Sequence, residues 1–186
     1  MHTFTTERLI IRPIEEQDRE FYCSLYMDEK IMRHIGPAFT REQANKAFDL
    51  TFKPSVKAKD FIKTWAIIDK STSQSIGIQA LSWKEPTTNN LFEQSSAPEI
   101  GIMLDRSSNG KLYPEEAMGA LVEFCFKQTS SPQIKAQYFS SNFATKRFVK
   151  KLGFITEETN TKKPENISYE FIKPEMWTQN IIEKIY

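Results

Sequence analysis

Residues Glu99–Lys127 read EIGIMLDRSSNGKLYPEEAMGALVEFCFK, and the fold can be worked outward from this stretch. It predicts a short apolar strand, a polar turn with one glycine, and then a helix. Pro114 suits the first helical turn, where its missing N–H costs nothing. Glu115 and Glu116 complement the positive end of the helix dipole. The turn therefore offers unpartnered N–H groups to an anion, although an ordinary strand–turn–helix connection would read the same way.

Length and charge limit the class of protein. The 186 residues suit one domain, and 25 Lys and Arg against 24 Asp and Glu leave no excess for a nucleic-acid or anionic membrane surface. No apolar run approaches the roughly 20 residues of a membrane span, and the N-terminus lacks signal-peptide features. Cys23 and Cys125 lack metal-ligand spacing, so buried free thiols are predicted. We expect a cytoplasmic protein without nucleic-acid, membrane or metal partners.

The rest of the chain mixes strands with helices. Strands are predicted at residues 8–13, 65–68, 76–83, 100–104, 133–139, 154–158 and 167–173. Helices are predicted at residues 15–27, 40–52, 114–127 and 142–152, and a terminal helix or tail at 174–186. Segment 69–75 predicts a hairpin turn, and the long polar segment 84–98 is typical of functional loops. These features predict one α/β domain over residues 1–186 with a mixed sheet.

Four motifs in this order resemble the GCN5-related N-acetyltransferase (GNAT) family, in particular its ribosomal-protein alanine N-acetyltransferase branch. They are TERLIIRP at 6–13, EIGIML at 99–104, NGKLYPEEA at 109–117 and NFATKRFVKKLGF at 142–154. The resemblance implies a single N-acetyltransferase domain with splayed central strands and flanking helices. It also implies acetyl-CoA as donor and a primary amine as acceptor, either a protein N-terminus or a small molecule.

The resemblance further implies where the cofactor binds. The pantetheine arm would pair with the main chain at Met103 and Leu104, much as a peptide adds to a sheet edge. A backbone N–H near Met103 would stabilise the oxyanion. Asn142 would contact the pantetheine arm. The turn residues implied to wrap the pyrophosphate are Ser107, Asn109, Gly110, Lys111, Leu112 and Tyr113.

Several positions depart from the family pattern. Leu112 replaces the second glycine of the usual turn, and its Cβ could hinder a phosphate. Glu115 places a carboxylate beside the expected anion site unless it points away. Gln137 and Val149 stand where alanine-acetylating relatives use a glutamate base and a tyrosine acid. An amide and an alkyl group cannot perform that proton chemistry.

Glu99 is therefore the candidate base, since it begins the strand that is expected to splay. A solvated strand-end carboxylate is the alternative reading, and Glu93 in the long loop is a second candidate base. Thr145 keeps a hydroxyl that could hydrogen-bond the leaving sulfur. Direct attack by the amine needs no covalent enzyme intermediate, which agrees with the absence of a nucleophile–histidine motif.

Two rival functions remain open at this stage. Gln137, Val149 and Leu112 motivate a non-catalytic acyl-CoA-binding or regulatory module on the same fold. A nucleotide-binding domain is disfavoured, because neither phosphate-binding glycine motif is present. Edge strands near the C-terminus could pair in a homodimer.

Overall fold

The structure is a computed structural model that describes residues 2–52, 60–84, 97–129, 131–156, 164 and 166–177. The strands are β1 (Phe4–Thr5), β2 (Leu9–Pro13), β3 (Asp60–Asp69), β4 (Gln74–Lys84), β5 (Glu99–Leu104), β6 (Ile134–Phe139), β7 (Ile155–Thr156) and β8 (Ile167–Ile172). The α-helices are α1 (Arg19–Met27), α2 (Glu29–Met32), α3 (Arg41–Phe52), α4 (Tyr113–Gln128) and α5 (Phe143–Lys151). Short 3₁₀ turns are η1 (Glu16–Asp18), η3 (Arg106–Ser108) and η4 (Pro174–Met176).

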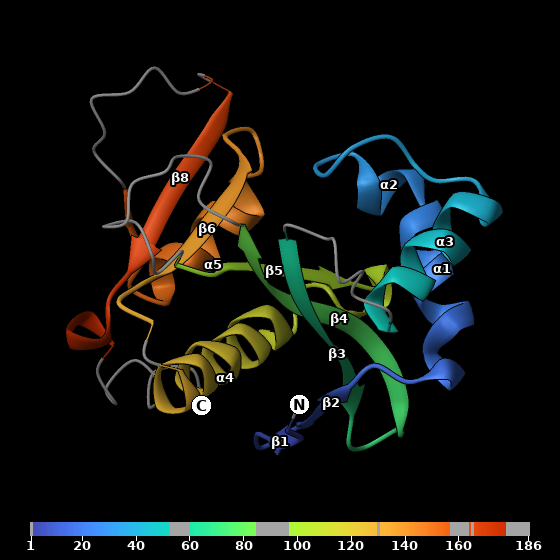
Figure 1. Cartoon of the computed structure of the whole chain (residues 1–186), viewed down its shortest axis with the longest axis horizontal. Coiled ribbons are helices and arrows are strands. Elements are labelled where there is room, and N and C mark those ends of the chain that lie inside the picture. Colours follow the sequence, from blue (N-terminus) through green and yellow to red (C-terminus); the bar gives the residue numbers. More distant parts are fainter. Residues whose placement is uncertain are drawn as a thin grey trace.

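The strands form one mixed sheet of eight in the order β1-β2-β3-β4-β5-β6-β8-β7 (Figure 1). Neighbouring strands are antiparallel except β5 and β6, which run parallel in the middle of the sheet. This arrangement confirms the predicted α/β mixed sheet. It also confirms the hairpin, because β3 and β4 pair along their length on either side of the turn after Asp69.

Helices cover both faces of the sheet. Helices α4 and α5 pack on one face, the α4–α5 face, and α1 to α3 on the other, the α1–α3 face (Figure 1). Side chains along β5 alternate between the two, as a strand requires. Ile100 and Leu104 belong to the cluster under α4, whereas Met103 belongs to the cluster under α1–α3. Even-numbered residues of β5 therefore point to the α4–α5 face, and odd-numbered residues point to the α1–α3 face.

Local signals in the sequence fix the helix ends. The N–H of Thr40 donates to Gln43 Oε1 over 2.8 Å, and the N–H of Gln43 donates to Thr40 Oγ1 over 3.2 Å, so these two residues form a capping box before α3. Asn142 caps α5, and Gly153 ends it with a left-handed φ of 86°. Cys23 and Cys125 are free and buried, as predicted.

Two short elements were not predicted from the sequence, the strand β1 and the one-turn helix α2. The segment 174–186, predicted as a terminal helix or tail, is described only to residue 177, and η4 occupies its start. Most of the 84–98 loop, with Glu93, lies outside the described residues. Strands β1 and β7 are the sheet edges, and pairing of two copies at the C-terminal edge, β7, stays a prediction. None of the helices in the described ranges has the length and apolar character needed to cross a membrane.

Candidate active site

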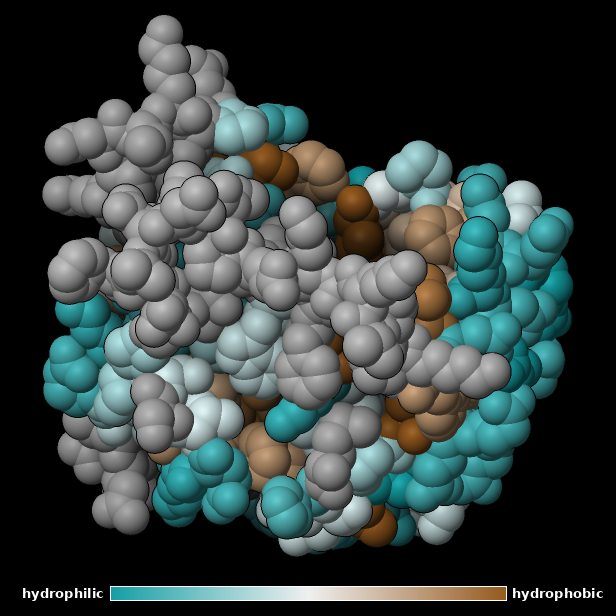
Figure 2. All heavy atoms as spheres, viewed as in Figure 1, coloured by the Kyte–Doolittle hydropathy of each residue, from teal (hydrophilic) through white to brown (hydrophobic). Residues whose placement is uncertain are grey.

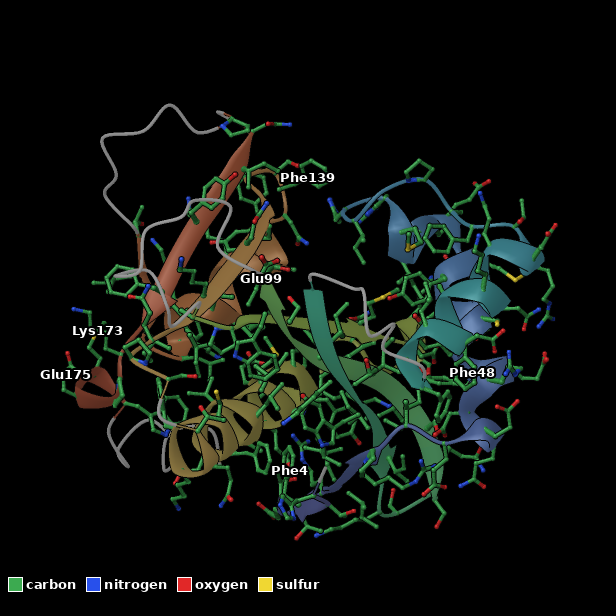
Figure 3. The ribbon with its side chains drawn as sticks, in the orientation of Figure 1. Phe4, Phe48, Glu99, Phe139, Lys173 and Glu175 are labelled. Atoms are coloured by element: carbon green, nitrogen blue, oxygen red, sulfur yellow. The ribbon has the colours of Figure 1, made fainter. Side chains whose placement is uncertain are left out.

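The parallel strands β5 and β6 pair at one point only. Glu99 lies opposite Lys135, and the N–H of Lys135 donates to the carbonyl of Pro98 over 2.8 Å. Beyond this bridge the two strands diverge (Figure 1), which confirms the predicted splay. Figure 3 shows Glu99 near the root of this gap and Phe139 at the far end of β6.

The main chain of β5 presents alternate residues to the gap. The carbonyl of Pro98 faces β6, whereas the N–H of Asp105 faces β4 and donates to Ile76 over 2.9 Å. Because backbone polar groups alternate between the two edges of a strand, the N–H and C=O of Ile102 and Leu104 face the gap. No described strand pairs with Ile102 on that side. This edge is open to a ligand with amide groups of its own.

A cavity of about 1230 Å³ occupies the gap and is lined from both faces of the sheet. On the α4–α5 face its wall includes Gly110, Asn142 and Thr145, and on the α1–α3 face it includes Tyr26 and Ile31. In Figure 2 apolar side chains line the notch between the β6–β8 end of the sheet and α2, whereas the outer surface of α1–α3 is hydrophilic. The cavity is therefore bordered by residues of both helical layers.

The turn between β5 and α4 borders this cavity through Asn109, Gly110 and Leu112. Gly110 and Leu112 have left-handed φ angles of 77° and 61°. Within the described part of the chain, no acceptor is found for the N–H groups of Gly110, Lys111 and Leu112. Consecutive free donors at the start of a long helix form a site for an anion. A leucine in the left-handed region is unusual, so tertiary contacts must hold the turn.

Arg8 supplies those contacts from β2. Its Nη1 donates to the carbonyl of Lys111 over 2.9 Å, and its Nε donates to Glu116 Oε2 over 2.6 Å. Glu116 is only 1% exposed, and its other oxygen accepts from Thr6 and from the N–H of Arg8. The guanidinium also lies 4.5 Å from the centre of the Tyr113 ring. These bonds fix the turn from the side away from the cavity.

Tyr113 anchors the same turn through its hydroxyl. The hydroxyl donates to Asp69 Oδ2 over 2.6 Å, at the end of β3. Hydrogen bonds from Ser71 and from Tyr113 lower the pKa of Asp69 to about 2. The hydrogen bond to Asp69 and burial raise the pKa of Tyr113. Tyr113 and Asp69 thus stay a neutral donor and an ionised acceptor at ordinary pH.

The structure brings most of the residues singled out in the sequence to one cavity. Those that line it are Glu99, Met103, Leu104, Asn109, Gly110, Leu112, Asn142 and Thr145. Ser107, Lys111 and Tyr113 do not line it. Ser107 is engaged with Asp105, and the backbone of Lys111 with Arg8. The catalytic and cofactor roles of these residues remain predictions.

The residues that depart from the family pattern also lie at or near the cavity. Leu112 is 46% exposed and lines the cavity, as do Gln137 and the buried Val149. The carboxylate of Glu115 lies 3.3 Å from Lys151 Nζ, so a neighbouring cation compensates its charge. The Oδ1 of Asn142 accepts from the N–H of Thr145 over 3.2 Å, which leaves the amide NH₂ available.

The α1–α3 face of the gap has an empty space beside Glu99. Glu99 and Gly101 have the parity of Met103 and therefore point to this face. A Cβ built on Gly101 would meet nothing within 4 Å. A glycine inside a strand often marks close approach of a ligand.

Sequence reasoning missed other cavity residues. Arg106 lines the cavity where Ser107 was expected. Gln79 of β4 also lines it, is 1% exposed, and has no hydrogen-bond partner for either side-chain amide atom. A glutamine in the apolar run IGIQALSW was the available signal. The α2 residues at the cavity carried no recognisable signal. Among the described residues, no three His, Cys, Asp or Glu side chains gather as a metal would require.

Comparison with known proteins shows similarity in both sequence and fold. A family model described as "Acetyltransferase (GNAT) domain" matches residues 8–155. "Uncharacterized N-acetyltransferase p20" of Bacillus licheniformis is 25% identical over 84% of each chain. The crystal structure of spermidine N-acetyltransferase from Vibrio cholerae with CoA and spermine has a TM-score of 0.71 at 14% identity, over 92% of this chain and 99% of that one.

A further solved structure bears on the branch of the family. The ribosomal-protein-S5-alanine acetyltransferase from Vibrio fischeri has a TM-score of 0.66 at 16% identity, over 96% of this chain and 100% of that one. Identities this low establish a shared fold. The match of the family model to most of the sequence establishes more. This chain belongs to the GNAT family of N-acetyltransferases, enzymes that use acetyl-CoA.

Proposed function

We propose that this enzyme transfers the acetyl group of acetyl-CoA to a primary amine by direct attack in a ternary complex. One observation carries the proposal: the gap between β5 and β6 holds a cavity lined from both faces of the sheet. A donor on the α4–α5 face and an acceptor on the α1–α3 face could then meet without either leaving its own side.

The donor would lie along the gap. Its pyrophosphate would accept hydrogen bonds from the free N–H groups of Gly110, Lys111 and Leu112. Its pantetheine amides would pair with the main chain of Ile102 and Leu104, as an added strand does. The NH₂ group of Asn142 supports a further contact to the pantetheine arm. A cofactor placed in this way would bring its thioester towards the root of the gap, near Glu99.

The amine would arrive over Gly101 and lose a proton to Glu99, directly or through water. Its lone pair would attack the thioester carbon, and a main-chain N–H on the gap edge of β5 would stabilise the oxyanion. The edge alternation favours Ile102 or Leu104 for this role over Met103. The carbon–sulfur bond then breaks, and the thiolate takes up a proton that the nitrogen has released, directly or through water. The hydroxyl of Thr145 could hydrogen-bond the leaving sulfur.

The acceptor is either a protein N-terminus, as the ribosomal-protein branch would suggest, or a small amine. The rival reading is a non-catalytic acyl-CoA-binding module, motivated by Gln137 and Val149. The opening on the α1–α3 face favours the enzyme, because a protein that only binds acyl-CoA needs no second entrance.

Two measurements test the proposal. Calorimetry should detect CoA binding, and a thiol-release assay with acetyl-CoA should detect turnover across a panel of peptides and small amines. Binding without turnover on every amine would favour the non-catalytic module. Absence of CoA binding would refute both readings.

A further inference from the structure

The acceptor side of the cavity carries a pair of cations on a fixed helical turn. Lys30 and Arg33, in and just after α2, line the cavity on the α1–α3 face. Asp28 caps this turn by accepting from the N–H groups of Lys30 over 2.7 Å and Ile31 over 3.1 Å. Met32, between the two cations in sequence, is buried under the same layer. The backbone that carries Lys30 and Arg33 is therefore anchored at the cavity.

These two cations lack the acidic partners that neighbouring cations have. In the same layer, Arg19 lies 2.7 Å from Asp49 and Arg41 lies 2.7 Å from Glu20. Lys30 and Arg33 have no carboxylate partner anywhere in the described ranges. Both side chains line the cavity, and no carboxylate of the described residues pairs with either charge.

The histidine beside Arg33 does not compensate its charge. Arg33 Nε donates to His34 Nε2 over 3.0 Å. In this bond the ring nitrogen is the acceptor, and an imidazole contributes no negative charge. It uses one of the five donors of the guanidinium, and the other four are left for a ligand.

Separate cations are available for the phosphates of the donor. Arg106, Arg147 and Lys151 line the cavity from the β5–α4 turn and from α5, on the face of the expected pyrophosphate site. Lys30 and Arg33 lie on the other face, where Glu99 is the only carboxylate among the described lining residues. The acceptor space thus has a carboxylate at its root and two cations on its wall.

We infer that the acceptor is an amine that also carries an anionic group, either a carboxylate or a phosphate. This inference rests on the proposed function and narrows its substrate class. The amine would point to Glu99 while the anion contacts Lys30 and Arg33. A polyamine would instead bring its second ammonium group against these cations, which opposes its binding.

Binding to the CoA-saturated enzyme tests the inference without relying on turnover. Calorimetry would compare glucosamine 6-phosphate with glucosamine, β-alanine with β-alaninamide, and both pairs with spermidine. We expect the anionic member of at least one pair to bind about tenfold or more tightly than its neutral partner. The pair that discriminates tells whether a phosphate or a carboxylate is preferred.

The double variant Lys30→Gln/Arg33→Gln should abolish that discrimination while CoA affinity stays within about twofold. Lys46→Gln removes an exposed charge of α3 that does not line the cavity, and should change neither. Equal affinities within both pairs, tighter binding of spermidine, or a parallel loss of CoA affinity in the double variant would overturn the inference. If the enzyme binds the anionic member of a pair more tightly but transfers no acetyl group to any amine, the proposed function is refuted and the anion site is still supported.

Discussion

Arg8 donates a hydrogen bond from Nη1 to the main-chain carbonyl of Lys111 over 2.9 Å, and so joins the second strand to the turn before α4. The same guanidinium pairs with the buried carboxylate of Glu116. One side chain therefore holds both the turn and the start of the helix, across more than 100 residues of sequence.

Replacing Arg8 with Met should destabilise the protein and loosen the turn. Glu116 would be left as a buried carboxylate without its cation, which costs about 3 kcal/mol when one partner stays partly exposed. Chemical denaturation measures the free energy of unfolding. Arg41→Met is the matched control, because the Arg41–Glu20 pair is exposed and should contribute little to stability. Equal losses in the two variants would contradict the assigned role of Arg8.

Gly101→Val should block the acceptor and spare the fold. Its side chain would fill the empty space on the α1–α3 face, and a β-branched residue suits a strand. We expect kcat/KM for the amine to fall at least about tenfold, because the amine must cross this space. Melting temperature and CoA affinity should change little. An unaltered kcat/KM would show that the amine takes another route.

Gly77→Ala gives the opposite pattern one strand away. A Cβ at Gly77 would lie 2.4 Å from Leu104 Cδ2 and 2.6 Å from the carbonyl oxygen of Met103. Backbone atoms cannot easily yield, so the variant should lose about 1–3 kcal/mol of stability. The comparison of the two glycines by thermal unfolding separates a space left for a ligand from a space required by packing.

Glu99→Gln should lower kcat/KM for the amine by about 10²–10⁴-fold, as expected for loss of a general base. The amide keeps the shape of the side chain but cannot accept the proton. The acidic limb of the profile of kcat/KM against pH should disappear. If the limb persists unchanged, Glu99 is not the base and its carboxylate serves another purpose.

Asn142→Asp should separate the capping and cofactor roles of this residue. The carboxylate can still accept from the N–H of Thr145, so the stability of α5 should be kept. The NH₂ donors are lost and a negative charge appears in the cavity, so CoA affinity should fall about tenfold. Asn142→Ala should lose about 1 kcal/mol of stability as well. Calorimetry and denaturation together give both quantities.

Tyr113→Phe should alter stability at acid pH. Because the pKa of Asp69 is depressed to about 2, its contribution to stability is complete above its ordinary pKa and is lost as the pH falls from about 4 to 2. Removing the Tyr113 hydroxyl should raise the pKa of Asp69 and cost about 1.5–3 kcal/mol near neutrality. The cost should shrink as the pH approaches 2, because the ionised acceptor is progressively lost there. A cost independent of pH would argue against the bond to Asp69.

Local signals explain why much of this fold could be predicted. The capping pair Thr40 and Gln43, the hairpin turn after Asp69, and Gly153 after α5 each act within a few residues of sequence. The position of Asn142 was also readable as a helix cap. Elements whose ends are set by neighbouring residues can be found without knowing what packs on them.

What could not be predicted depends on contacts between distant segments. Helix α2 has one turn and no hydrophobic period, yet it brings Lys30 and Arg33 to the cavity. The hydrogen bond from Arg8 to Lys111 joins β2 to the turn before α4, and no residue in the turn predicts it. Ser107 was expected at the cavity, but a nearby carboxylate, Asp105, engages its hydroxyl, and Arg106 lines the cavity instead.

The single bridge between Glu99 and Lys135 has a mechanical consequence. It makes the centre of the sheet a seam, with β1 to β5 on one side and β6 to β8 on the other. A ligand that hydrogen-bonds to both strands across the gap would connect these two parts of the sheet. Hydrogen exchange of the backbone amides in β5 and β6 should then slow when the ligand binds, including at residues that the ligand does not contact.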